Sequence, residues 1–281
     1  MVDPMTDLIL PSNANYLNFQ HRLPDKRLAP WVQCLWSIGG TGRLAEPRTE
    51  KFYPDAGASL SIRLTSSHPI ITFCFNRHTL IETLDTTAPC LGIRFKAAGA
   101  HCLLGLLPEA FTDTHHRLDN ELEPLSLQTS SLQRPRLQGL KPVVERLYQL
   151  DSQQGLRLLE TWLLHRLESQ PPSDSRITTI VQAIGELQLP PQQLGATLGF
   201  TRRTLERKLK REVGVTPGQL VAYSRLNRAR HGLLETTLPL AEIALQCGYY
   251  DQAHFTHAFQ SLAYETPAAY RKRKLSQIYK A

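Results

Sequence analysis

The strongest constraint on this chain is an internal repeat near its C-terminal end. One copy, LGATLGFTRRTLERKLKREVGVTP, begins at Leu194, and a second, IALQCGYYDQAHFTHAFQSLAYETP, begins at Ile243. Gly199 aligns with Gly248, and after a single inserted residue the two copies stay in register to a shared Thr-Pro pair. Internal repetition predicts that one small structural unit occurs twice.

Each copy has the sequence pattern of two helices joined by a tight turn. A glycine, which readily adopts the left-handed conformation that ends a helix, precedes a capping residue, Thr201 or Asp251. The next helix has apolar residues four positions apart, such as Leu205 and Leu209, and polar residues on its other face. A Thr-Pro pair, suited to the cap and first turn of a helix, then starts another helix. The pattern predicts two helix-turn-helix units.

A long helix is predicted between the two units, from Pro217 to about Leu234. Its apolar positions recur at helical spacing and define an inner side made of Leu220, Leu226, Ala229 and Leu233. Such a helix would act as a rigid spacer between the units.

Positive charge is concentrated in the same part of the chain. Residues 172–281 hold 15 Lys+Arg against 8 Asp+Glu, whereas residues 1–171 hold 17 of each. The second helix of the first unit crowds six basic residues against two acids: Arg202, Arg203, Arg207, Lys208, Lys210 and Arg211 against Glu206 and Glu212. A plain helical bundle would normally mix its surface charges more evenly, so the pattern favours a polyanionic partner.

The region from about Arg176 to Lys274 resembles the DNA-binding domain of the AraC/XylS transcription regulators. The resemblance rests on G-F-T-x-R-x-L-x-R-x-L-K from Gly199 to Lys210, G-V-T-P from Gly214, I-A-x-x-x-G-Y from Ile243, D-Q-x-H-F from Asp251 and T-P-x-x-Y-R from Thr266 to Arg271. It implies seven helices, with the third and sixth placed in successive major grooves of promoter DNA.

The resemblance also implies which side chains meet the bases. They are Arg202, Arg203, Glu206 and Arg207 in the first unit, and Gln252, Ala253, Thr256 and His257 in the second. Arg203 and Arg207 are expected to read guanines, because a guanidinium can donate two hydrogen bonds to one guanine edge.

The second unit departs from the family pattern at three positions. His257 stands where the family usually has arginine, and the Ala253 side chain offers no hydrogen bond to a base. Tyr264 occupies a place where glycine is usual before the Thr-Pro pair. We therefore expect the second unit to read DNA weakly or differently.

The first part of the chain has a different pattern. Between about Trp31 and Phe95, short segments rich in β-branched and aromatic residues alternate with turn formers, which predicts strands. The stretches 140–150 and 156–167 then recur at helical spacing and predict two helices, which pack on the strands or mediate dimerisation. Pro171-Pro172 breaks this pattern and marks a domain boundary.

Two segments of this part resemble N-terminal sensor domains of regulators in the same family. They are KFYPDAGASLSIRL at Lys51 to Leu64 and GIRFKAAGAHCLLG at Gly92 to Gly105. The implied fold is a cupin-like barrel, and an effector would bind inside it near residues 58–64 and 70–75. The alternative is a fully packed barrel without a ligand.

The predicted fold class is therefore α+β. Residues 1–170 are expected to form a mostly-β, cupin-like sensor or dimerisation domain that ends in two helices. Residues 171–175 are the expected linker, and residues 176–281 the all-α, seven-helix DNA-binding domain.

Motifs of catalysis and metal binding are missing from the sequence. There is no Walker loop, no G-x-S-x-G and no convincing Cys-His nucleophile pair. The histidines at 68, 78, 101, 115 and 116 do not have the spacing of a cupin metal site. Five scattered cysteines argue against a disulfide framework and a zinc site: Cys34, Cys74, Cys90, Cys102 and Cys247. We expect no enzyme activity, no metal and no cofactor.

Targeting and membrane signals are missing as well. The N-terminus is not a basic segment followed by an apolar run, and no stretch approaches eighteen apolar residues. We expect a cytoplasmic, nucleoid-associated protein with no membrane partner.

These patterns predict a sequence-specific, DNA-binding transcription regulator, expected to be an activator. Its expected partners are double-stranded promoter DNA and RNA polymerase, and the sequence leaves open a small effector and a homodimer. Two other functions stay open. One is a cupin-type ligand-binding or catalytic protein that uses DNA only as an anchor, and the other is an architectural DNA binder with little specificity.

Overall fold

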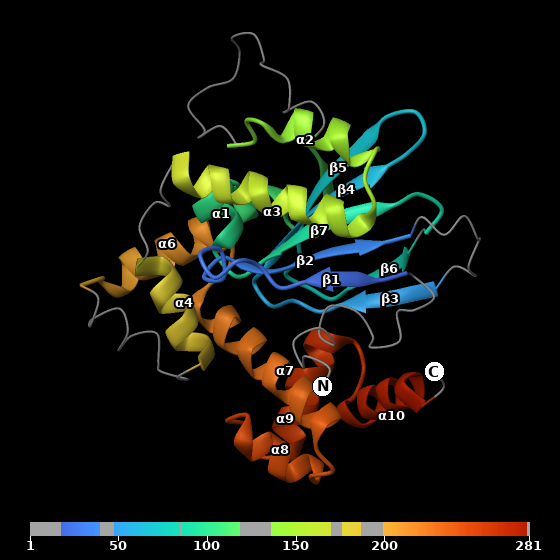
Figure 1. Ribbon diagram of the computed structural model, residues 1–281. Coiled ribbons are helices and arrows are strands. Elements are labelled where there is room, and N and C mark those ends of the chain that lie inside the picture. Colours follow the sequence, from blue (N-terminus) through green and yellow to red (C-terminus); the bar gives the residue numbers. More distant parts are fainter. Residues whose placement is uncertain are drawn as a thin grey trace.

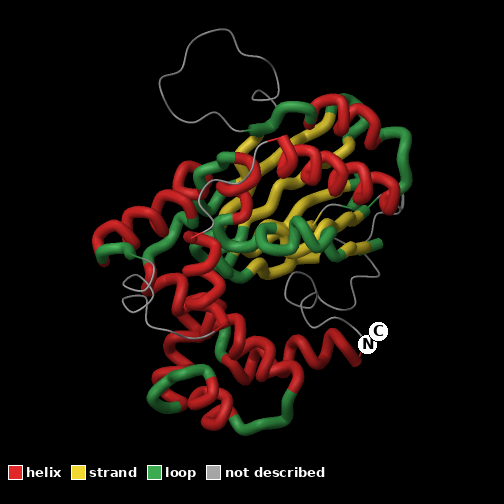
Figure 2. The backbone as a smooth tube through the Cα atoms, turned by 60° about the vertical axis from the view of Figure 1, so that its left-hand side comes forward, coloured by secondary structure: helices red, strands yellow, loops and turns green. Residues whose placement is uncertain are grey.

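The computed structural model describes residues 18–39, 48–84, 86–118, 136–169, 176–186 and 199–279. Figure 1 shows a β-rich N-terminal lobe above a lobe built of helices, and Figure 2 shows the same two lobes from another side. Strands occur only in the N-terminal lobe of the described chain, which confirms the predicted α+β fold.

The N-terminal lobe contains a large antiparallel sheet and a separate pair of strands. The order in the large sheet is β1 (Gln20–Arg22), β2 (Val32–Ile38), β7 (Cys90–Phe95), β4 (Ala58–Leu64), β5 (Pro69–Phe75) and β8 (His115–Arg117). The small sheet pairs β3 (Arg48–Phe52) with β6 (Leu80–Leu84). The predicted strands correspond to β2, β4, β5, β6 and β7, whereas β1, β3 and β8 are short polar segments without a strand pattern.

The two faces of the large sheet differ because side chains alternate along each strand. Leu60 of β4 and its cross-strand partner Ile93 of β7 are fully buried on the face that the helices cover. Ser59 and its neighbours lie on the opposite face. That face turns toward the small sheet, because His115 of β8 contacts Glu82 of β6.

Helices cover the apolar face of the large sheet (Figure 1). They are α1 (Gly99–Leu104), the 3-10 helix η3 (Pro108–Phe111), α2 (Leu140–Leu147) and α3 (Ser152–Ser169). The helices α2 and α3 are the two predicted after the strands, and α3 buries Leu156, Leu159 and Trp162 against the core. This burial supports core packing as the role of their apolar faces.

The helical lobe follows the repeat. It consists of α4 (Arg176–Glu186), α6 (Arg202–Glu212), α7 (Pro217–Glu235), α8 (Leu240–Gln246), α9 (Gln252–Ala263) and α10 (Pro267–Tyr279). The helix expected before Gly199 and the linker expected at 171–175 lie outside the described residues. The predicted inner side of the spacer helix is buried, since its four residues are at most 4% exposed.

Local capping explains why these helices start where they do. The Thr201 side chain accepts a hydrogen bond from the Thr204 N–H at the start of α6, and Asp251 does the same at α9. Thr216 forms a capping box with Gln219 at α7. These three caps confirm the helix starts that the sequence predicts.

An apolar core joins the two lobes. It contains Phe75 and Leu104 from the N-terminal lobe together with Leu205, Leu209 and Val213 of the first helix-turn-helix unit. The second unit has a core of its own, into which Tyr53 of the N-terminal lobe also reaches. The N-terminal lobe therefore packs on both units.

No helix in the described part of the chain is both long enough and apolar enough to cross a membrane.

Candidate nucleic-acid interface

Helix α6 separates its buried side from a strongly basic outer side. Leu205 and Leu209 are at most 2% exposed and face the core. The four residues expected to read bases all lie on the exposed side: Arg202, Arg203, Glu206 and Arg207. Together with Lys210 and the start of α7 they line one shallow hollow. The structure therefore brings together all four predicted residues of the first unit.

Ion pairs on α6 distinguish its arginines from one another. Arg202 pairs with Glu206 one turn later, with Nε to Oε1 at 3.0 Å. The guanidinium groups of Arg203 and Arg207 have no hydrogen-bond or ion-pair partner within the described chain. A contact between either of these two side chains and an anion would therefore break no pair in the described chain.

The remaining charged side chains of α6 form ion pairs within the chain, although Lys210 and Arg211 stay exposed. Glu212 is buried and accepts from Lys208 at 3.0 Å and from Arg211 at 2.6 Å. Lys210 lies 3.4 Å from Glu109 of η3 in the other lobe. The C-terminal end of α6 is thus occupied with structural contacts, whereas its N-terminal half presents free cations.

Helix α9 is built on the same plan with different chemistry. Phe255 and Phe259 are fully buried. The four residues predicted to meet bases, together with Gln260, line a shallow hollow on its outer side: Gln252, Ala253, Thr256 and His257. The Thr256 hydroxyl donates to the Gln252 carbonyl of its own helix at 2.8 Å. No arginine or lysine stands on this face, so α9 offers a DNA phosphate or base fewer strong donors than α6.

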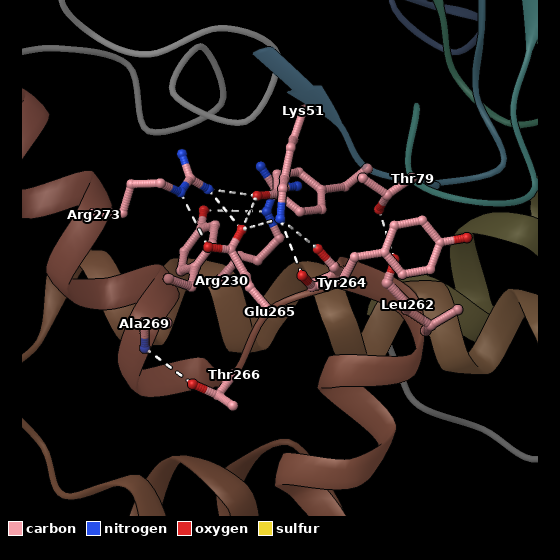
Figure 3. A network of polar contacts seen from close by, with 12 residues as sticks. Lys51, Thr79, Arg230, Leu262, Tyr264, Glu265, Thr266, Ala269 and Arg273 are labelled. Atoms are coloured by element: carbon pink, nitrogen blue, oxygen red, sulfur yellow. Dashed lines mark hydrogen bonds and ion pairs between the residues drawn. The ribbon is translucent and has the colours of Figure 1, made fainter. Parts of the chain in front are cut away.

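A polar network joins the end of α9 to the N-terminal lobe, as Figure 3 shows. Its centre is Glu265, in the turn between α9 and α10. The Glu265 carboxylate accepts from the Tyr53 hydroxyl at 2.7 Å, from Lys51 Nζ at 3.2 Å and from Arg273 at 2.7 and 3.0 Å. The Arg230 guanidinium lies over the Tyr53 ring, 4.1 Å from its centroid. The KFYPD motif is recognisable in the sequence, but its contact with Glu265 is revealed only by the three-dimensional packing.

The protonation states of this network strengthen the contact between the two lobes. Burial alone would raise the pKa of Glu265, but hydrogen bonds from Arg273 and Tyr53 and the nearby cations outweigh it, and that pKa lies below its usual value. Burial raises the pKa of the Tyr53 hydroxyl, so this group stays protonated and can donate. The carboxylate is therefore charged, and its partners all carry the hydrogens it needs.

Lys51 and Thr79 also cap α9 from the other lobe. The last carbonyls of a helix have no partner within it. Lys51 Nζ donates to the carbonyls of Ala263 at 3.2 Å and Tyr264 at 3.3 Å. The Thr79 hydroxyl donates to the Leu262 carbonyl at 2.6 Å. Three successive carbonyls at the C-terminal end of α9 are thus satisfied by N-terminal side chains.

The end of α6 meets the same part of the N-terminal lobe. Gly214, with φ of +83°, follows α6, and its carbonyl accepts from Arg77 Nε at 3.1 Å. The Tyr223 hydroxyl of α7 donates to the Arg77 carbonyl at 2.8 Å. Phe75 and Pro108 pack directly against Gly214, which leaves no room for a side chain there.

The N-terminal lobe carries a second polar region on the face of the large sheet that turns toward the small sheet. Arg94 is buried and forms an ion pair with Asp55, and it also donates to the Ser59 hydroxyl at 3.1 Å. Although burial disfavours its charge, the neighbouring Asp55 raises the pKa of Arg94. His115 pairs with Glu82 across the two sheets, and this hydrogen bond raises the pKa of His115.

No group of three or more histidine, cysteine or acidic side chains in the described ranges is arranged to hold a metal ion. The five cysteines are free thiols and buried.

Two family models match separate parts of the chain. Residues 194–273 match a helix-turn-helix domain, and residues 20–117 match a domain of unknown function, DUF6597. The first covers the repeat that the sequence revealed, and the second covers most of the β-rich lobe.

Curated relatives also match through part of their length. The "HTH-type transcriptional regulator ArgR" of Pseudomonas aeruginosa is 30% identical over 132 residues, which is 47% of this chain and 39% of that protein. The "HTH-type transcriptional activator RhaS" of Klebsiella pneumoniae is 35% identical over 69 residues, 25% of each chain. This chain therefore spans well under half of the length of these relatives.

A solved AraC-type DNA-binding domain from Chromobacterium violaceum is 28% identical and covers 38% of this chain and 95% of its own, with a TM-score of 0.33.

Proposed function

We propose that this chain, whose C-terminal part is a helix-turn-helix domain of the AraC/XylS type, is a sequence-specific DNA-binding transcription regulator. Residues 176–281 form the proposed DNA-binding domain. The observation that carries the proposal is the outer side of α6, where Arg203 and Arg207 are exposed and unpaired in the described chain.

In the proposed mechanism, α6 and α9 enter successive major grooves on one face of the DNA, about 34 Å apart along its axis. The basic side chains and the helix N-termini supply affinity through phosphates, and this part of the binding does not depend on sequence. Arg203 and Arg207 read guanines, each with two hydrogen bonds to one base edge. The α9 face, which has no arginine or lysine, contributes less discrimination.

This proposal is tested by footprinting the protein on the genomic DNA fragments that it binds. A sequence-specific regulator protects about two helical turns of DNA, and the fragments that it protects share a definite sequence. An architectural binder would protect DNA without a shared sequence. A protein that uses DNA only as an anchor would be identified by turnover of a small molecule.

We also propose that an effector, where one controls this chain, binds between the two sheets of the N-terminal lobe. The support is the polar face of β4 and β7, where Ser59 and its cross-strand partner Arg94 lie opposite the apolar core. The Ser59 hydroxyl beside the Arg94–Asp55 ion pair suits a ligand with a polar group such as a hydroxyl or a carboxylate. The alternative remains a packed lobe without a ligand.

A thermal-shift screen of the full chain against small acids and polyols tests the effector proposal. A hit should lose its stabilising effect in Ser59→Ala, which removes one hydroxyl from the polar face. If no compound raises the unfolding temperature, the packed lobe without a ligand is favoured.

Contact with RNA polymerase and self-association complete the proposed activator role. Both rest on the resemblance to activators rather than on a surface of this chain. Sedimentation of the chain with and without its DNA site would show whether one or two copies bind.

A further inference from the structure

We propose that the N-terminal lobe sets the distance and angle between the two recognition helices by holding the C-terminal end of each. This inference rests on the proposed function and concerns how the two readers are positioned. Three N-terminal side chains carry it: Lys51 and Thr79 at α9, and Arg77 at α6.

The contacts with α9 supplement the helix's own left-handed cap, in which the Tyr264 N–H donates to the Gln260 carbonyl. At the equivalent place in the first unit, Gly214 adopts the left-handed conformation without a side-chain penalty. In the second unit Tyr264 adopts it, with φ of +55°, which is costly for a residue with a side chain. Lys51 compensates, because its three ammonium donors meet the Ala263 carbonyl, the Tyr264 carbonyl and the Glu265 carboxylate. A positive charge at this end also suits the helix dipole.

The contact with the end of α6 comes from the turn between β5 and β6 of the N-terminal lobe. Arg77 donates to the Gly214 carbonyl, and its own carbonyl accepts from Tyr223 of α7. Thr79, two residues later, holds α9. One short turn between β5 and β6 therefore contacts the ends of both recognition helices.

Hydrogen bonds fix this turn to the rest of the N-terminal lobe. The buried Asn76 side chain donates to the Phe52 carbonyl of β3 at 3.1 Å, which ties the turn to the strand that carries Lys51. The Asp113 carboxylate accepts from the backbone N–H groups of Arg77 at 2.7 Å and His78 at 3.2 Å. The three gripping side chains thus belong to one fixed body.

Fixing two readers on one body makes binding sensitive to the spacing of their target elements. Adding one base pair between the elements moves the second by about 3.4 Å and turns it by about 35° around the DNA axis. A chain whose two recognition helices are fixed to one body cannot follow this change. Without those contacts, each recognition helix can still shift relative to the spacer helix α7. The reading faces themselves stay exposed, so the N-terminal lobe positions the readers without covering them.

The test measures the affinity of the full-length chain for three DNA sites. The two elements of the site stand at the preferred spacing in the first, one base pair closer in the second and one base pair further apart in the third. Wild type should prefer its best spacing by roughly tenfold, the size of a single mismatch penalty. The double variant Lys51→Met and Thr79→Val keeps the side-chain shapes and removes the donors at α9. Its preference should fall to about threefold or less.

Matched variants separate positioning from charge and folding. Lys26→Met removes the same charge from an exposed lysine beside Asp25, which contacts α3, and should leave the spacing preference unchanged. Lys51→Arg keeps donors at α9 and should preserve it. Thermal unfolding checks that each variant is folded. If the double variant is not folded, the single variants Lys51→Met and Thr79→Val are measured in its place.

The outcomes of this test are distinguishable. A folded variant that keeps the tenfold preference overturns the inference while the proposed function stands. A wild-type chain with no preferred two-element site overturns the proposed function, and the inference falls with it.

Discussion

Substitution of two glycines should reveal how closely the lobes are packed. Gly199 and Gly214 both have positive φ, at +73° and +83°, and they lie just before and just after helix α6 of the first unit. Among the described residues, a Cβ added at Gly199 meets nothing within 4 Å. A Cβ added at Gly214 would lie 2.7 Å from the Phe75 ring and 2.9 Å from Pro108 Cβ, both in the N-terminal lobe.

The structure predicts that Gly→Ala lowers the free energy of unfolding by different amounts at the two positions. Gly199→Ala carries only the penalty of left-handed backbone, about 1–2 kcal/mol. Gly214→Ala adds overpacking, and because Phe75 is fully buried it cannot move aside. The total loss of unfolding free energy should be roughly 2–5 kcal/mol.

Urea unfolding of the full-length chain, followed by circular dichroism, measures both variants against wild type. The difference between the two costs isolates the contact between the lobes, since the backbone penalty is common to both. Equal losses for Gly199→Ala and Gly214→Ala would refute the docking of the first unit on Phe75 and Pro108.

Four further outcomes are expected. Arg203→Ala should weaken specific binding by roughly 1–3 kcal/mol and relax one or two base positions, whereas Lys210→Ala should weaken all sequences equally; a randomised-site competition separates the two. His257→Arg should tighten binding and steepen its salt dependence by up to about one unit in a salt titration. Tyr264→Gly should stabilise the chain by about 1 kcal/mol in urea unfolding. Because the pKa of Glu265 lies below its usual 4.5, its stabilisation is complete above that pH and is lost as pH falls through the lowered value; Glu265→Gln should flatten this acid limb of thermal stability.

The elements with local signals were predictable from sequence. Capping residues such as Thr201 and Asp251, and the alternating pattern of β4, specify local geometry that needs no distant partner. The exposed sides of α6 and α9 follow from the same periodicity, so all eight predicted base-reading residues lie on outer faces.

The junction between the lobes was not predictable in this way. Lys51 and Glu265 are 214 residues apart, and neither has a local pattern that names its partner. The short strand β3 is polar and pairs with β6, from which strands β4 and β5 separate it in the chain, so periodicity could not reveal it. Tyr264 was noticed as a departure from glycine, yet its compensation by Lys51 depends on tertiary packing.

Selection from a random-sequence DNA library by the full-length chain, at physiological salt, tests the central claim most directly. The account predicts enrichment of one motif with two elements about one helical turn apart, guanine-rich in the element that Arg203 and Arg207 contact. A bound pool that remains random in sequence would contradict it.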